Sequence, residues 1–146
     1  MGGAGGSASK DMVLYDSGSW GISYENPGNY AYTGVSVGGA LLESADIKFV
    51  SESNAIRLIG SSNKIDLTNY SMLKVRAKAT NANLVACISN TKTVSSGTVK
   101  SMTIQVSAEY TEFVLDVTSL SGEYYFALWT LTSYNNTTYV DKIWLV

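Results

Sequence analysis

The sequence predicts an all-β domain, and three observations lead to that prediction. In residues 73–79, apolar and basic side chains alternate without a break, which is typical of a strand with one buried and one solvated face. Short apolar runs separated by turn residues follow one another along the chain, with no apolar repeat at helical spacing. Charged residues make up only 15% of the chain, whereas Ser, Thr, Asn and Gly are abundant. Together these features favour an antiparallel sandwich or barrel.

The expected strands can be assigned in chain order from the apolar runs. They are Met12–Tyr15, Trp20–Tyr24, Tyr30–Val37, Ile47–Val50, Ala55–Ile59, Lys64–Leu67, Met72–Ala79, Leu84–Ile88, Lys100–Val106, Thr111–Asp116, Tyr124–Leu131 and Thr138–Leu145. Between the second and third lies a turn in which Pro27 presets φ and Gly28 tolerates positive φ. We therefore expect a hairpin there, with Trp20, Ile22 and Tyr24 on one face of its first strand.

Two segments, 124–131 and 140–146, are apolar on both faces. In the first of them, Tyr124, Phe126 and Leu128 face one way, and Tyr125 and Trp129 face the other. A strand of this kind is either covered on both sides or presents an aromatic surface to a partner.

The length of 146 residues fits one domain. Residues 1–10 are rich in Gly and Ser and are expected to form a flexible linker or leader, with the folded domain at 11–146. They lack the apolar core of a signal peptide. No apolar segment is long enough to cross a membrane, and a net charge of −2 gives no footprint for nucleic acid.

Catalytic chemistry is poorly represented. The chain has no His, which excludes Ser–His–Asp and Cys–His sites as well as His-containing metal sites. The single Cys87 lies in an apolar run and is expected to be a small buried side chain. Most of the acidic residues fall at strand corners or in turns rather than in facing pairs. We therefore expect a protein that is not an enzyme.

Three segments, 64–75, 111–125 and 139–145, resemble in their order the jelly-roll β-sandwich of carbohydrate-binding modules and galactose-binding-like domains. They contain an Asp66-Leu67-Thr68 corner, an Asp116-Val117 corner followed by Gly122, and a last strand with Asp141. The residue patterns of these segments also resemble those of jelly-roll domains appended to phage and prophage tail or minor structural proteins of gut Firmicutes. This resemblance implies a jelly-roll sandwich of two antiparallel sheets on a virion or extracellular surface.

The resemblance further implies a non-catalytic module that binds a glycan by stacking sugars on aromatic rings. The alternative is a structural virion decoration or an oligomerisation domain whose partners are sister subunits. The candidate ligand-binding residues are Tyr30 and Tyr32 on the predicted hairpin, Tyr125 and Trp129 with Arg57 as a polar neighbour, and Tyr134 and Asn135 in a loop at the rim of the sandwich.

Many jelly-roll sugar modules hold a structural calcium ion near the two chain ends. Asp141 matches the position of an Asp that often contributes, and Asp16 could approach it from the first strands. Calcium takes six to eight oxygen ligands, and no clustered acidic loop supplies them. We therefore expect no cofactor, with Asp141 and Asp16 as the residues of any calcium site.

Overall fold

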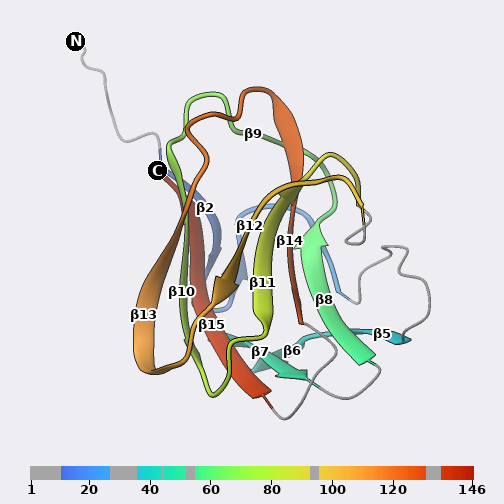
Figure 1. Ribbon diagram of the computed structural model, residues 1–146, viewed down its shortest axis with the longest axis vertical. Coiled ribbons are helices and arrows are strands. Elements are labelled where there is room, and N and C mark those ends of the chain that lie inside the picture. The colour runs from blue at the N-terminus through green and yellow to red at the C-terminus, as the bar shows by residue number, and fades with distance from the viewer. Residues whose placement is uncertain (1–10, 27–35, 44, 52–54, 93–95, 131–135) are drawn as a thin grey trace.

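The computed structural model describes residues 11–26, 36–43, 45–51, 55–92, 96–130 and 136–146. In these ranges the chain forms strands that lie in two sheets packed face to face (Figure 1). No described helix is long and apolar enough to cross a membrane. The all-β prediction is confirmed in its sandwich form.

The first sheet contains both the first and the last described strands, side by side and antiparallel. Its order is β13-β10-β15-β2-β3, and β7 pairs with β15 and with β6. The bounds are β2 Met12–Asp16, β3 Ser19–Trp20, β6 Leu41–Glu43, β7 Asp46–Ser51, β10 Met72–Ala79, β13 Ser107–Asp116 and β15 Asn136–Leu145.

The second sheet has the order β12-β11-β14-β8-β4, with β9 joined to β14 and β5 joined to β8. Its strands are β4 Tyr24–Glu25, β5 Ser36–Gly39, β8 Ala55–Ser61, β9 Ile65–Asp66, β11 Leu84–Ser89, β12 Thr98–Ile104 and β14 Glu123–Thr130. The pairing of β5 with β8 is parallel, whereas the other pairings in this sheet are antiparallel.

The main core lies between the sheets and follows from the alternation in the sequence. Leu73, Val75 and Ala77 of β10 are fully buried, and they face Phe126 and Leu128 of β14 across the same cluster. Burying each large apolar side chain contributes about 1.5–3 kcal/mol relative to leaving it exposed. The basic residues of β10 therefore lie on the outer face of the first sheet.

A second, smaller apolar cluster lies on the outward side of the second sheet. It consists of Ile56, Leu58, Val85, Cys87 and Ala127, all buried, with the partly buried Trp129 packed against them. The expectation that strand 124–131 is apolar on both faces is thus confirmed. The same packing confirms Cys87 as a buried apolar side chain.

The predicted single strand from Trp20 to Tyr24 is wrong. Trp20 ends β3 in the first sheet, while Tyr24 begins β4 in the second, so the chain changes sheet between them. At the crossing, Gly21 donates its backbone N–H to the Leu14 carbonyl at 2.9 Å. The Trp20 and Tyr24 rings still stack, with centroids 4.4 Å apart. The hairpin expected around Pro27 lies outside the described residues, as do residues 1–10.

The two Asp corners fold alike. The Asp66 carboxylate accepts hydrogen bonds from the Thr68 hydroxyl and N–H, at 2.6 and 2.9 Å. Asp116 Oδ1 accepts from the Thr118 N–H at 2.9 Å. These bonds, from the hydroxyl first and then the backbone, lower the pKa of both carboxyl groups. The corner motifs therefore turn the chain between strands, and they specify fold rather than ligand.

These corners predict a pH dependence of stability. A carboxyl whose pKa is lowered on folding stabilises the fold at pH values above its ordinary pKa of about 3.9. This contribution is lost as pH falls through the folded pKa. We expect the double variant Asp66→Ala, Asp116→Ala to be less stable than the parent at pH 7, with a smaller difference at pH 3. Urea unfolding at both pH values measures this, with the exposed Ser119→Ala as control. An equal difference at both pH values would contradict the prediction.

Candidate functional site

Tyr125 lies on the outer face of the second sheet, and two lysines lie beside its ring. The Nζ atoms of Lys64 and Lys92 are each 5.7 Å from the ring centroid, within the range of cation–π attraction. Lys64 stands one step beyond the antiparallel pair Tyr124–Ile65, which places it opposite Tyr125. Lys92 follows the end of β11 and forms an ion pair with Glu25 of β4, with Nζ and Oε2 2.5 Å apart. Three segments besides β14 therefore build the surroundings of this half-buried ring.

Trp129 shares the outward face of β14 with Tyr125, four residues further along. At about 3.3 Å per residue the two positions are about 13 Å apart. The Trp129 indole lies beside the thiol of Cys87. Burial, opposed by hydrogen bonds from Trp129, Ala127 and Thr98, raises the pKa of Cys87 to about 11, so this thiol is not a nucleophile at neutral pH.

The sequence prediction for this face is correct in one part and wrong in another. Tyr125 and Trp129 do share a face, as expected from their spacing. Arg57 was expected beside them, but it alternates along β8 with Leu58, and Leu58 is the residue that pairs with Trp129. Arg57 therefore belongs to the inward-facing set of β8, and its backbone N–H donates to the Thr130 hydroxyl at 2.8 Å. Lys64, Lys92 and Glu25 take its place as the polar neighbours.

Four other predicted ligand-binding residues lie outside the described residues. They are Tyr30, Tyr32, Tyr134 and Asn135, and their assignment stays a prediction.

The outer face of the first sheet carries a second set of aromatic rings with cations above them. Lys78 Nζ lies 4.9 Å from the Tyr110 centroid and 5.3 Å from that of Tyr139. Further along the face, Lys142 and Lys74 lie 4.6 and 5.8 Å from the Trp144 ring. These rings were not predicted from the sequence as a site, because they come from β13 and β15, on either side of β10.

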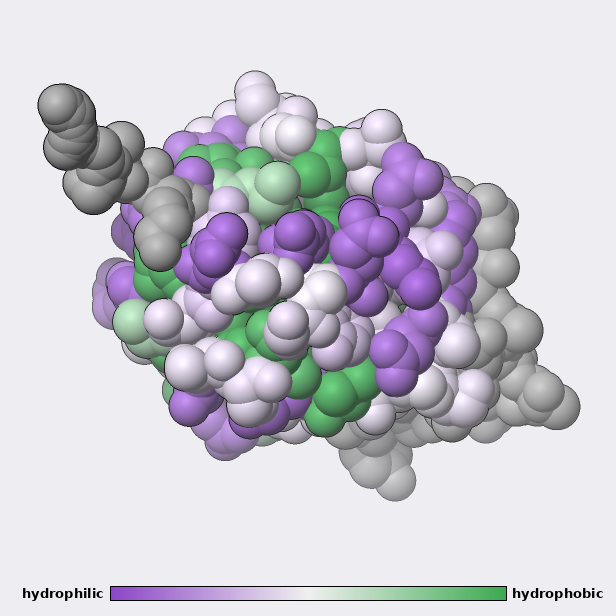
Figure 2. Space-filling model, turned by 90° about the horizontal axis from the view of Figure 1, so that it is seen from above, coloured by the Kyte–Doolittle hydropathy of each residue, from purple (hydrophilic) through white to green (hydrophobic). Residues whose placement is uncertain are grey.

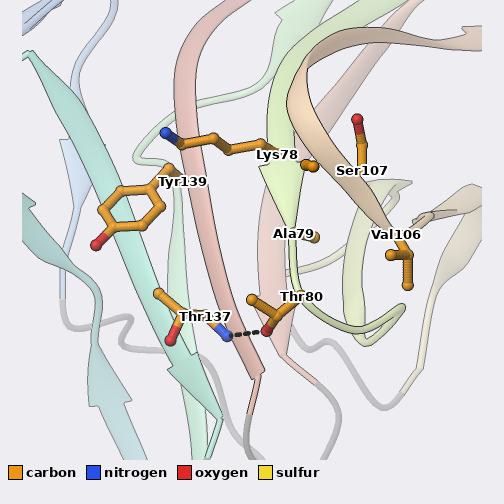
Figure 3. Close-up of a pocket in the computed structure, with 8 residues that line it drawn as sticks. Lys78, Ala79, Thr80, Val106, Ser107, Thr137 and Tyr139 are labelled. Carbon is orange, nitrogen blue, oxygen red and sulfur yellow. Dashed lines mark hydrogen bonds between the residues drawn. The ribbon is translucent and has the colours of Figure 1, made fainter.

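A groove of about 440 Å³ opens at one end of this face (Figure 3). Lys78, Ala79 and Thr80 at the end of β10 line it, together with residues before and within β13 and with Thr137 and Tyr139 of β15. The Thr137 N–H donates to the Thr80 hydroxyl at 2.9 Å, which ties β15 to the turn after β10. The groove is thus bounded by three adjoining segments of one sheet.

Asp141 and Asp16, the residues expected for any calcium site, lie near each other on the first sheet. Asp141 forms an ion pair with Arg76, and its pKa is raised, first by burial, with Asp46 and Asp16 contributing. No group of three or more acidic or cysteine side chains in the described part of the chain could hold a metal ion. The absence of a cofactor stays a prediction.

The end of the sandwich beside β9 has two hollows, of about 300 and 240 Å³. Both are lined by Met12 and Asp66, and the larger also by Tyr70. From above, this end shows small hydrophobic patches separated by hydrophilic groups (Figure 2). The cation–aromatic pairs of the described residues are instead on the two sheet faces, which are therefore the better candidates for a binding surface.

No family model matches the sequence, and no curated protein matches it. Solved structures do match. A family 29 carbohydrate-binding module has a TM-score of 0.64 at 12% identity, over 93% of this chain and 87% of that one. Another, from Piromyces equi, has a TM-score of 0.63 at 13% identity, over 93% and 89%. A variant module in complex with mannohexaose has a TM-score of 0.62 at 11% identity, over 93% and 90%. The fold is therefore the jelly-roll β-sandwich of carbohydrate-binding modules.

Proposed function

We propose that this protein is a non-catalytic glycan-binding module that binds an oligosaccharide along the outer face of the second sheet. The observation that carries the proposal is the Tyr125 ring, which has the ammonium groups of Lys64 and Lys92 beside it and the Glu25 carboxylate paired with Lys92. Pyranose rings have apolar faces that stack on aromatic rings, and their hydroxyl groups accept from ammonium groups and donate to carboxylates. This face supplies all three kinds of group.

The contacts of Tyr125 also prearrange the site. The two lysines over its ring and the Lys92–Glu25 pair restrict these side chains before a ligand arrives. Restricting them in advance lowers the entropy that binding has to offset. Lys92 and Glu25 have side-chain exposures of 34% and 13%, so their interaction is partly shielded from water and can orient a sugar hydroxyl.

The separation of Tyr125 and Trp129 favours a ligand of several sugars. A gap of about 13 Å along the strand is longer than one pyranose ring. An oligosaccharide that stacks on Tyr125 would extend toward Trp129, and we expect affinity to rise with chain length. Family 29 modules have been solved with mannohexaose and with cellulohexaose bound, in variants made to probe ligand recognition, which supports testing these two hexasaccharides first.

The chemistry of the chain supports a binding role without catalysis. The sequence has no His, and the thiol of Cys87 is buried with a raised pKa.

We also propose that the module belongs to a phage tail or another surface protein, which the genes next to its own would test. The alternative, a decoration or oligomerisation domain, predicts self-association that buries Trp129 or Trp144.

The test compares three proteins, the parent chain, Tyr125→Ala and Tyr125→Phe. We expect the parent to bind mannohexaose or cellohexaose, and to bind the matching monosaccharide more weakly. Loss of the ring in Tyr125→Ala should weaken binding by about tenfold or more, whereas Tyr125→Phe, which keeps the ring, should retain most of it. Isothermal titration calorimetry and affinity gel electrophoresis measure both effects.

Two controls keep this test specific. Val114→Ala removes an exposed apolar side chain from the other sheet, where Val114 is 47% exposed, and should bind like the parent. Thermal unfolding should show Tyr125→Ala folded. A parent protein that binds no glycan and forms dimers in light scattering would replace this proposal with the oligomerisation role.

A further inference from the structure

The groove on the first sheet has a chemical character of its own. It lies on the opposite side of the sandwich from Tyr125, since β10, β13 and β15 belong to the other sheet. Lys78 crosses above the Tyr139 ring at one side of it, and Val106 and Ser107 stand at the other side (Figure 3). Val106 is 62% exposed, which leaves an apolar wall open to solvent. The groove therefore combines a ring, an apolar wall, hydroxyl groups and one cation.

The three basic residues of β10 differ in whether a carboxylate pairs with them. Lys74 pairs with Glu112 at 2.7 Å, and Arg76 pairs with Asp141. Lys78 has no carboxylate within ion-pair distance in the part of the chain that the structure describes. It lies instead over the rings of Tyr110 and Tyr139. Of the three, Lys78 is therefore the one whose charge is left for an external anion.

The remaining lining of the groove fits a carboxylate on a sugar better than a free anion. Lys78 is the charged side chain among the lining residues, and none of those described is acidic. A charge-assisted hydrogen bond from Nζ would hold a carboxylate, while the Tyr139 ring and Val106 give apolar surface for a pyranose ring. A volume of about 440 Å³ lies within the size range of small-molecule sites.

We propose that this groove is a second binding site, specific for a carboxylated sugar such as a hexuronate residue, with Lys78 holding the carboxylate and Tyr139 stacking on the ring. The site does not depend on the proposed function of the Tyr125 face. It uses other residues, another sheet and another ligand class, so either site can fail without the other.

The test titrates trigalacturonate and its neutral counterpart, galactotriose, into the parent, Lys78→Met, Lys78→Arg and Lys74→Met. We expect the parent to bind trigalacturonate more tightly than galactotriose. Loss of the charged hydrogen bond in Lys78→Met should weaken trigalacturonate binding by roughly ten- to a hundredfold. Lys78→Arg should recover part of it. Lys74→Met removes the same charge from the same strand, where it is already paired with Glu112, and should bind like the parent.

Several outcomes would overturn this proposal. A parent protein that binds neither sugar, or binds both equally, rules out a uronate site. Equal losses in Lys78→Met and Lys74→Met would show a diffuse charge effect rather than a site. Competition by acetate at the same concentration as the sugar would show a simple anion site. Tyr125→Ala should leave trigalacturonate binding unchanged, which separates this result from the test of the second sheet.

Discussion

Replacing Phe126 with alanine is expected to lower the free energy of unfolding by about 3–5 kcal/mol. The Phe126 side chain is fully buried in the main core. Its strand, β14, is paired with β11 on one side and β8 on the other, so the backbone cannot close readily around the cavity. The backbone at Phe126 is held further by its N–H, which donates to the buried Ser61 hydroxyl at 3.0 Å.

The adjoining residue supplies the matched control. Tyr125 has its ring on the outer face of the same strand, half-buried, so Tyr125→Ala should cost much less stability than Phe126→Ala. Urea unfolding followed by tryptophan fluorescence measures both, and the comparison requires equal m values. If the two variants lost similar stability, Tyr125 would be a core residue, and its assignment to the glycan site would have to be withdrawn.

Replacing Gly21 with alanine is expected to destabilise the protein by about 1–3 kcal/mol or more. A Cβ added at Gly21 would lie 2.2 Å from the Val13 carbonyl oxygen, a backbone atom that cannot rotate away. Either β2 or the crossing segment must shift to relieve this contact. A shift would also weaken the hydrogen bond from the Gly21 N–H to the Leu14 carbonyl.

The nearby Ser23→Ala variant is the control, because Ser23 is exposed and its backbone carbonyl still accepts from the Ser62 N–H. It should unfold within about 0.5 kcal/mol of the parent. Near-ultraviolet circular dichroism adds a local readout, since the rings of Trp20 and Tyr24, which flank Gly21 in the sequence, stack on each other. Unchanged stability and an unchanged spectrum in Gly21→Ala would contradict the close approach of β2.

The fold class and the inward face of the main strands follow from the sequence alone. The strand predicted at 72–79 has the same bounds in the structure, because a period of two over the seven residues 73–79 is typical of a strand with one buried face. The sequence also determines that Tyr125 and Trp129 share a face, since that follows from their spacing along one strand. These properties depend on residues close together in the chain.

The tertiary structure alone decided which side chains meet between strands. The chain changes sheet between Trp20 and Tyr24, and at this crossing Gly21 lies close to Val13, seven residues before Trp20. Arg57 faces away from Trp129 because the register of β8 against β14 pairs Trp129 with Leu58. Lys64 and Lys92 converge on Tyr125 from two different segments. Strand register and sheet order depend on pairings between distant residues, and a shift of one residue would reverse every face.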